Sequence, residues 1–139
     1  MKHLTPEEKS WLACAIDGEG CIYYHDKIDK NGWRNRRVEI QVVNTDIQFV
    51  ERARKLLNGI KISEQGRRSK KMVYRARIAD HKQVLSILEQ IKDYLIIKKN
   101  LAQNVIDFIK KTDWDKQSGE ARKKRSILMK KIWQKRKSS

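Results

Sequence analysis

Two acidic residues, Asp17 and Glu19, lie within the segment WLACAIDGEGCIYY, residues 11–24, and each is followed by a glycine. The apolar residues before Asp17 are typical of a helix, and Gly18 and Gly20 are expected to end it. The C-terminal end of a helix carries partial negative charge, which favours cations rather than acids. Carboxylate and carbonyl oxygens are, however, the ligands that Mg²⁺ prefers. The segment therefore predicts a Mg²⁺ site at the end of the first helix.

The composition indicates where further ligands for this cation would come from. One helix end offers too few oxygens to hold Mg²⁺ tightly, but a second copy related by a two-fold axis would double the set. The chain has 33 Lys+Arg against 17 Asp+Glu, a net charge of +16. Such an excess of positive charge favours a polyanionic partner, most commonly a nucleic acid, whose phosphates would complete the coordination.

The same sequence argues against a membrane or secreted protein. No apolar run is long enough to span a bilayer, and the first residues, MKHLTPEEKSW, lack the apolar region of a signal peptide. We therefore expect a soluble intracellular protein with no membrane partner, in the cytoplasm or nucleoid or in an organelle matrix. Cys14 and Cys21 form no CxxC pair, so we expect reduced thiols and no zinc site.

Apolar periodicity and turn residues predict one α+β domain over residues 1–113. Thr5 and Glu8 form a capping box before the first helix, Asp80 and Gln83 form another, and Asn44 to Asp46 offer caps for the helix between them. In chain order we expect a helix over 6–17, strands over 21–27 and 37–42, a helix over 47–57, strands over 60–65 and 72–78, and helices over 81–91 and 96–111. Two hairpins, each followed by a helix, predict an antiparallel sheet with helices on one face.

Residues 114–139 are expected to form a separate basic extension. Positions 116–139 hold ten Lys/Arg and only Glu120 as an acid. Ser118 can cap a helix that carries Ile127, Leu128, Ile132 and Trp133, so we predict an amphipathic basic helix. This helix would add phosphate contacts or pack on the back of the sheet, and a solvated charged helix is the third interpretation.

Alternation along the strands assigns one face of the sheet to the core and the other to solvent or a ligand. The expected core positions are Ile22, Tyr24, Val38, Ile40, Val42, Ile60 and Ile62. The expected outward positions are Tyr23, His25, Lys27, Arg37, Glu39, Gln41, Lys61, Ser63, Gln65, Arg75 and Arg77, and the turn between the last two strands adds Arg67, Arg68, Lys70 and Lys71.

The outward residues are of the types that bind nucleic acid. Arg, Gln and Glu can contact guanine, adenine and cytosine in a major groove, whereas Lys and loop Arg residues contact phosphates. An ordinary solvated face usually mixes charge signs, but residues 61–77 hold seven basic residues against Glu64 alone. We therefore predict that this face binds nucleic acid.

The segment from Leu12 to Gly20, LACAIDGEG, resembles the nine-residue motif that names the LAGLIDADG homing endonucleases. Order and spacing match, although Cys14 and Ala15 depart from the usual residues. The motif occurs once, and members of this family with a single motif are homodimers of an αββαββα unit, which is the predicted element order. The resemblance covers roughly residues 5–111.

The resemblance implies a dimer in which the motif helices of two subunits pack through Leu12, Ala13, Ala15 and Ile16. Glu19 and the carbonyl of Gly18 would bind the catalytic metal, whereas Asp17 would be structural. Asn44 falls where the family orients the attacking water, although a plain helix cap is the alternative. Lys98 falls where the family keeps a lysine near the scissile phosphate; a surface lysine is the alternative, and Lys99 is its rival for the role.

The activity implied by the resemblance is Mg²⁺-dependent hydrolysis of both strands of duplex DNA across the minor groove. Mn²⁺ would substitute for Mg²⁺, and Ca²⁺ would support binding without cleavage. The target would be long and pseudo-palindromic, and the products would have 3′ overhangs.

Two other functions are compatible with the same surface. The first is an intron-encoded maturase that binds its own intron RNA, because attraction to phosphates does not depend on the sugar. The second is a DNA-binding regulator without catalysis. The acid at position 19 favours the endonuclease, since neither alternative needs it.

Overall fold

The computed structural model describes residues 3–66, 71–114 and 119–137, which form a four-stranded antiparallel sheet and five α-helices. In chain order the elements are α1 Pro6–Glu19, β1 Gly20–Ile28, β2 Arg34–Asn44, α2 Ile47–Leu57, β3 Ile62–Gly66, β4 Met72–Ile78, α3 His81–Ile91, the 3₁₀ turn η1 Lys92–Tyr94, α4 Lys99–Lys111 and α5 Gly119–Lys137. This order confirms the α+β class and the αββαββα unit, with a basic helix after it. None of the described helices is long and apolar enough to cross a membrane.

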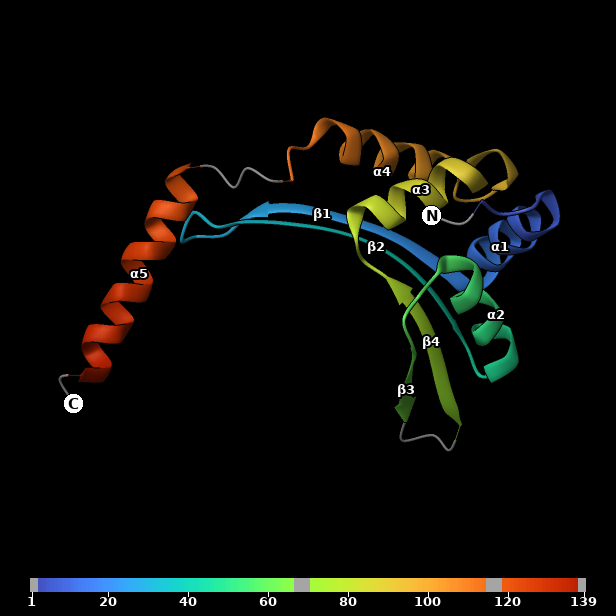
Figure 1. Ribbon diagram of the computed structural model, residues 1–139, viewed down its shortest axis with the longest axis horizontal. Helices are drawn as coiled ribbons and strands as arrows, with labels where there is room; N and C mark the ends of the chain where they lie inside the picture. The colour runs from blue at the N-terminus through green and yellow to red at the C-terminus, as the bar shows by residue number, and fades with distance from the viewer. Residues whose placement is uncertain (1–2, 67–70, 115–118, 138–139) are drawn as a thin grey trace.

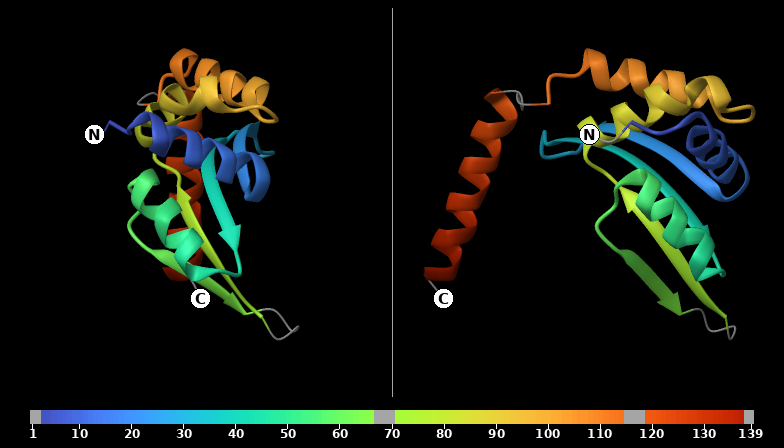
Figure 2. Two further views of the ribbon diagram at one scale, coloured as in Figure 1. Left: turned by 90° about the vertical axis from the view of Figure 1, so that its right-hand side faces the viewer. Right: turned by 45° about the vertical axis from the view of Figure 1, so that its right-hand side comes forward.

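The sheet has the strand order β1-β2-β4-β3, so the second strand of each hairpin lies in the middle and the two hairpins pair through β2 and β4. The sheet is strongly curved, and α1, α2, α3 and α4 all lie on its convex side (Figures 1 and 2). No described helix packs against its concave side, although α5 projects on that side from the outer end of the β1–β2 hairpin, apart from the sheet (Figure 1). The fold therefore leaves one whole face of the sheet open to a ligand.

The first helix begins as expected but ends later. Thr5 and Glu8 form the predicted capping box, with the Thr5 side chain accepting the N–H of Glu8 and the Glu8 carboxylate accepting the N–H of Thr5. The helix continues through Gly18 to Glu19, two residues beyond the predicted end. The prediction that Gly18 ends it was wrong because the cap is Gly20, whose extended backbone leads directly into β1.

The predicted caps of α2 and α3 are present, but one partner at α3 differs. Of the candidates Asn44 to Asp46, Asp46 caps α2, and its carboxylate accepts the N–H groups of Gln48 and Phe49. At α3, Asp80 accepts the N–H of Gln83, but the Gln83 side chain donates to the carbonyl of Asn58 at 2.7 Å. That contact ties the start of α3 to the loop after α2, so the second capping box is only half formed.

The strand faces agree with the predicted alternation except at two core positions. Ile22, Val38, Ile40 and Val42 are buried on the helix side of the sheet. Ile60 is 96% exposed, because β3 begins only at Ile62 and Ile60 lies in the loop after the left-handed residue Asn58. Tyr24 contacts the ring of Phe108 in α4 but stays 40% exposed, so it lies at the margin of the core.

The packed body extends slightly beyond the predicted domain end at residue 113. Trp114 packs against the core, its indole N–H donates to the carbonyl of Ile109 at 3.1 Å, and its ring stacks on His81 at 4.6 Å. Ser118, the predicted cap of the last helix, lies outside the described residues. Figure 1 shows α5 standing apart from the sheet and from α1–α4, so packing on the back of the sheet is not what the structure has.

The two glycines of the motif are expected to respond oppositely to alanine. A Cβ on Gly20 would lie 2.7 Å from the Cα of Ile16 and 3.0 Å from the carbonyl oxygen of Gln41, both backbone atoms, whereas a Cβ on Gly18 would meet nothing within 4 Å. Gly20→Ala should therefore lower the free energy of unfolding by about 1–3 kcal/mol through overpacking. Gly18→Ala should raise it by up to about 1 kcal/mol, since alanine favours helix. Urea denaturation of both variants measures this; equal effects would contradict it.

Candidate active site and nucleic-acid interface

The C-terminal end of α1 is held by a lysine that is distant in sequence. The Lys98 ammonium donates to the carbonyls of Ile16 and Asp17, each at 2.9 Å. In return the Asp17 carboxylate accepts the backbone N–H groups of Ile96 at 2.7 Å and Lys98 at 3.0 Å. This reciprocal contact places a cation on the negative end of the helix, where the macrodipole favours it.

The ionisation of Asp17 follows from the same contacts. Partial burial raises the pKa of the Asp17 carboxyl, but hydrogen bonds from the backbone amides of Ile96, Lys98 and Ile97 and the charge of Lys98 together lower it below the ordinary 3.8. Ionised Asp17 therefore stabilises the fold above pH 3.8, and this contribution is lost as the pH falls through the lowered pKa. Both carboxylate oxygens are occupied, which supports a structural role for Asp17.

Glu19, in contrast, projects from the end of α1 into solvent. It is exposed, and its carboxylate has no hydrogen bond or ion pair with any described residue. Gly18, immediately before it, is also exposed, while Lys98 occupies the two preceding carbonyls. The end of α1 thus offers a cation the carboxylate of Glu19 and the carbonyl of Gly18. Both are hard oxygen donors of the kind that suits Mg²⁺.

These two oxygens are fewer than the six ligands that Mg²⁺ requires. Among the described residues, no group of three or more His, Cys, Asp or Glu side chains could hold a metal ion. The donor chemistry of the site therefore fits Mg²⁺, and the number of donors requires ligands from outside the chain.

Asn44 lies at the same end of the sheet as Glu19. Gly20, the first residue of β1, pairs with Val42 in β2. Asn44 ends β2 two residues after Val42, and therefore lies past the start of β1, on the side from which α1 enters the strand. Its side-chain oxygen accepts the N–H of Asp46 at 2.8 Å, which fixes the amide. Since Asp46 caps α2, the alternative role of Asn44 as the helix cap was wrong.

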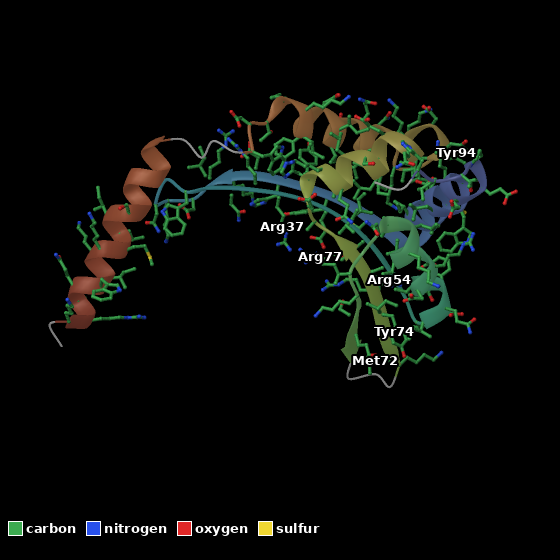
Figure 3. The ribbon with its side chains drawn as sticks, in the orientation of Figure 1. Arg37, Arg54, Met72, Tyr74, Arg77 and Tyr94 are labelled. Carbon is green, nitrogen blue, oxygen red and sulfur yellow. The ribbon has the colours of Figure 1, made fainter. Side chains whose placement is uncertain are left out.

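The strand register brings the predicted DNA-contacting residues together on the concave face. Tyr23 pairs with Glu39, His25 with Arg37, Gln41 with Arg77, and Ser63 with Arg75, and paired residues share a face. Figure 3 shows Arg37 and Arg77 on the concave side of the sheet, away from α3 and α4. Lys27 lies further along the same face of β1, and Gln65 pairs with Val73 near the other end of the sheet.

Glu39 is an exception to its predicted role. It was expected to be exposed and able to contact a base, but only 9% of its surface is accessible. One carboxylate oxygen accepts Nε of Arg77, and the other lies 3.4 Å from Nη2 of Arg37. Glu39 therefore orients two arginines on the concave face. Arg37 lies two residues earlier on β2, and Arg77 lies diagonally across on β4.

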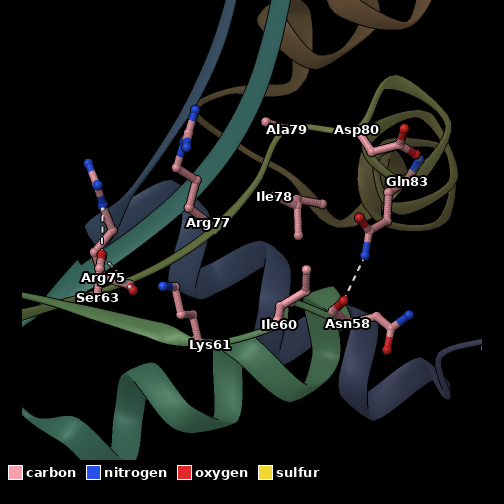
Figure 4. Close-up of a pocket in the computed structure, with 11 residues that line it drawn as sticks. Asn58, Ile60, Lys61, Ser63, Arg75, Arg77, Ile78, Ala79, Asp80 and Gln83 are labelled. Carbon is pink, nitrogen blue, oxygen red and sulfur yellow. Dashed lines mark hydrogen bonds between the residues drawn. The ribbon is translucent and has the colours of Figure 1, made fainter.

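A pocket of about 400 Å³ lies at the β3 edge of this face. Lys61, Arg75 and Arg77 line one side, and Arg75 Nε donates to the hydroxyl of Ser63 at 3.2 Å (Figure 4). Lys71, just before β4, is exposed. Arg67, Arg68 and Lys70 lie outside the described residues. The basic side chains that line the pocket give it an affinity for phosphate oxygens.

The structure corrects the predicted dimer interface. Leu12, Ala13, Ala15 and Ile16 are all buried within the single chain and cannot meet a second copy. The exposed side of α1 is instead formed by Glu7, Ser10, Cys14 and Gly18, which recur every three or four residues. Small residues at helical spacing on the solvent side of the motif were the signal that the sequence interpretation missed. Both free cysteines, Cys14 and Cys21, are exposed.

A curved sheet with a basic open face, and an exposed acid at the end of the helix preceding it, define a nucleic-acid-binding protein with a candidate metal site. The family model of the LAGLIDADG endonucleases matches residues 12–112, from the motif to the end of α4. The chain therefore belongs to the LAGLIDADG endonuclease family, which confirms the resemblance of the motif. A comparison with curated proteins gives no match.

Solved structures of homing endonucleases share the fold. I-CvuI, solved with the I-CreI target and Mg²⁺ and with its DNA not cleaved, has a TM-score of 0.60 at 21% identity over 75% of this chain and 66% of its own. I-SmaMI bound to cleaved DNA has a TM-score of 0.59 at 17% identity, over 89% of this chain and 43% of its own. The group I intron-encoded I-CeuI in complex with DNA has a TM-score of 0.55 at 16% identity, over 79% of this chain and 57% of its own. The chain thus spans two thirds or less of the length of each.

Proposed function

We propose that this protein is a homodimeric, site-specific endonuclease that hydrolyses both strands of duplex DNA in a metal-dependent reaction. The observation that carries the proposal is the exposed carboxylate of Glu19 at the end of the motif helix, which has no partner in the described part of the chain and lies beside an open basic sheet face. The target would be long and pseudo-palindromic, and cleavage across the minor groove would leave 3′ overhangs, as is typical of the family.

Glu19 and the carbonyl of Gly18 would hold Mg²⁺. When bound, the ion supplies charge neutralisation at the scissile phosphate and an acidified water. The same two groups from the second subunit, together with DNA phosphates, would complete the coordination. Because Glu19 is the only side chain each subunit contributes to the ligand set proposed here, its charge is the essential element of the site.

Two further residues would assist at the scissile phosphate. The Lys98 ammonium lies on the carbonyls of Ile16 and Asp17, directly before Gly18, and would stabilise charge that develops on the phosphate oxygens. Asn44, held by its bond to Asp46, would orient the attacking water. In the reaction the water oxygen bonds to phosphorus, the phosphorus–sugar oxygen bond breaks, and the leaving oxygen gains a proton.

The dimer would form through the exposed side of α1 and the segment beside its end. Ile96 and Ile97 are 86% and 74% exposed, and the backbone N–H of Ile96 is bound to Asp17. Exposed isoleucines beside a stripe of small helix residues favour burial against a second copy. Two-fold pairing there would bring both Glu19 carboxylates to the centre and leave the two sheets on the flanking DNA.

Selection of cleaved molecules from a randomised duplex DNA library tests the proposal. We expect purified protein with Mg²⁺ to release ends that share a staggered, two-fold symmetric consensus. Mn²⁺ should support the same cleavage, and Ca²⁺ should support binding alone. Products are sequenced to obtain the target and the stagger.

Other outcomes of the same selection would replace the proposal. Duplexes that are enriched by binding in Ca²⁺ but never cut in Mg²⁺ or Mn²⁺ would indicate a DNA-binding regulator. No enrichment of any duplex, together with binding of intron RNA, would indicate a maturase.

A further inference from the structure

The helix α5 is the largest feature of the chain that the endonuclease unit does not include. It lies outside residues 12–112, which match the family model. Its sequence, Gly119–Lys137, holds nine Lys/Arg residues and a single acid, Glu120. Figures 1 and 2 show it standing apart from the sheet and from α1–α4. A strongly basic helix with no packed partner among the described elements favours a ligand of opposite charge.

Basic and apolar side chains are mixed around α5, so the predicted amphipathic pattern was wrong. Successive residues turn by about 100° around a helix axis. Exposed Ile127 therefore lies between Lys130 and Lys131 on one side of the helix. On the other side, Arg136 lies between exposed Ile132 and Trp133. A helix that lies on a membrane or in a protein core needs one continuous apolar face. Cations on several sides instead suit a groove with phosphates on both walls.

The chain just before α5 is anchored next to the β1–β2 hairpin. The carbonyl of Asp113 accepts Nη1 of Arg36 in β2 at 2.9 Å, and Trp114 stacks on His81. Residues 115–118 separate Trp114 from the start of α5, so that start lies within about 18 Å of the anchor.

This anchor is remote from the candidate metal site. Glu19 precedes the first residue of β1, whereas Arg36 pairs with Asp26 near the opposite end of the same strand. Six residues of strand separate these points, a span of roughly 20 Å. Helix α5 therefore starts at the outer end of the sheet, away from Glu19.

We propose that α5 binds the phosphate backbone of duplex DNA beyond the base pairs that the sheet contacts. The position of this DNA rests on the proposed function, since the sheet must bind the central duplex. A major groove of about 12 Å accommodates an α-helix, and Lys131 on one side with Arg136 on the other would reach phosphates on both strands. In a dimer with Glu19 at the centre, the two α5 helices lie at opposite ends of the bound duplex. They extend its length without adding sequence preference, because phosphate contacts carry none.

The salt dependence of DNA binding tests α5 directly. The full-length protein is titrated with a long mixed-sequence duplex over a series of KCl concentrations. The α5 variant carries Lys130→Gln, Lys131→Gln and Lys135→Gln. The matched control loses the same charge on the convex side, through Lys55→Gln, Lys82→Gln and Lys111→Gln, all exposed. Glutamine keeps a high helix propensity, so both variants should fold.

We expect the slope of log K against log[KCl] to become shallower by about 0.9 for each phosphate that is no longer neutralised, or roughly 2–3 for each subunit of the α5 variant. The control should keep the wild-type slope. Hydroxyl-radical footprints on a selected target should lose protection at both outer flanks in the α5 variant only.

An α5 variant with the wild-type slope and footprint would overturn the proposal. Weaker binding of RNA with unchanged binding of duplex DNA would overturn it in favour of an RNA ligand. The salt dependence of DNA binding is measured without cleavage. A protein that does not cut DNA can therefore still confirm or contradict the role of α5.

Discussion

Replacement of Glu19 by glutamine is expected to abolish DNA cleavage and to leave DNA binding and the fold intact. The carboxylate is exposed and has no partner among the described residues, so its loss removes no internal contact. Among the described residues, it is also the only charged ligand that each subunit would offer Mg²⁺ in the proposed site. Loss of several kcal/mol of transition-state stabilisation corresponds to a rate decrease of about 10³-fold or more. The measurement is the single-turnover cleavage rate of the selected duplex at saturating protein with Mg²⁺.

Two control variants separate catalysis from folding. Glu89→Gln removes an exposed acid on α3, on the convex side of the sheet, and should cleave as the wild type does. Asp17→Asn weakens the contacts with the backbone of Ile96 and Lys98 and should lower the free energy of unfolding by about 1–3 kcal/mol. The Glu19→Gln protein should unfold at the wild-type urea concentration and bind DNA in Ca²⁺ as tightly as wild type. Cleavage within tenfold of wild type would exclude Glu19 as a metal ligand.

The elements of this fold were predictable because each carries a local signal. The capping box formed by Thr5 and Glu8 and the alternation in β2 and β4 depend only on neighbouring residues, and both are present. The open face was predictable for the same reason, since alternation with period two fixes which residues share a side. Three positions differed in burial: Ile60 lies in a loop before β3, Tyr24 lies at the margin of the core, and Glu39 is covered by two arginines.

The contacts that build the candidate site could not be predicted in this way. Asp17 and Lys98 are 81 residues apart, and no local pattern indicates that Lys98 would lie on the carbonyls of α1. The resemblance to the family suggested Lys98, but only the packing of η1 beside α1 explains its position. The burial of Glu39 likewise depends on the register of β2 and β4, which places Arg77 diagonally across from it, whereas Arg37 lies two residues earlier on β2 itself.

The two faces of the motif helix α1 could not be told apart from the sequence either. Its apolar residues Leu12, Ala13 and Ile16 were assigned to a dimer interface because the motif is associated with dimers, yet they are part of the chain's own core. A helix that packs on a sheet and also on a partner must use two faces. Periodicity reveals the larger face, whereas the smaller one, with Ser10, Cys14 and Gly18, is recognised only when burial is known.

Replacement of Cys14 by arginine is expected to convert the protein to a monomer and thereby to prevent cleavage. Cys14 lies in the middle of the exposed side of α1, one turn before Gly18, whose missing side chain leaves open space next to it. Where two copies of α1 meet at a two-fold axis, a residue near the axis faces its own copy. Two arginines there would clash sterically and repel each other, which costs several kcal/mol at a desolvated contact.

Cys14→Ser is the matched control, because serine preserves the size of the side chain and adds no charge. Sedimentation equilibrium should give twice the chain mass of 16.5 kDa for the wild type and for Cys14→Ser, and the single mass for Cys14→Arg. Because Cys14 is exposed, the Cys14→Arg chain should keep its fold and lose only the stabilisation that dimerisation adds. A loss of cleavage in Cys14→Arg would then follow from the loss of the second Glu19. A wild-type protein that cuts both strands as a monomer, or a dimeric Cys14→Arg protein, would show that the exposed side of α1 is not the contact between subunits.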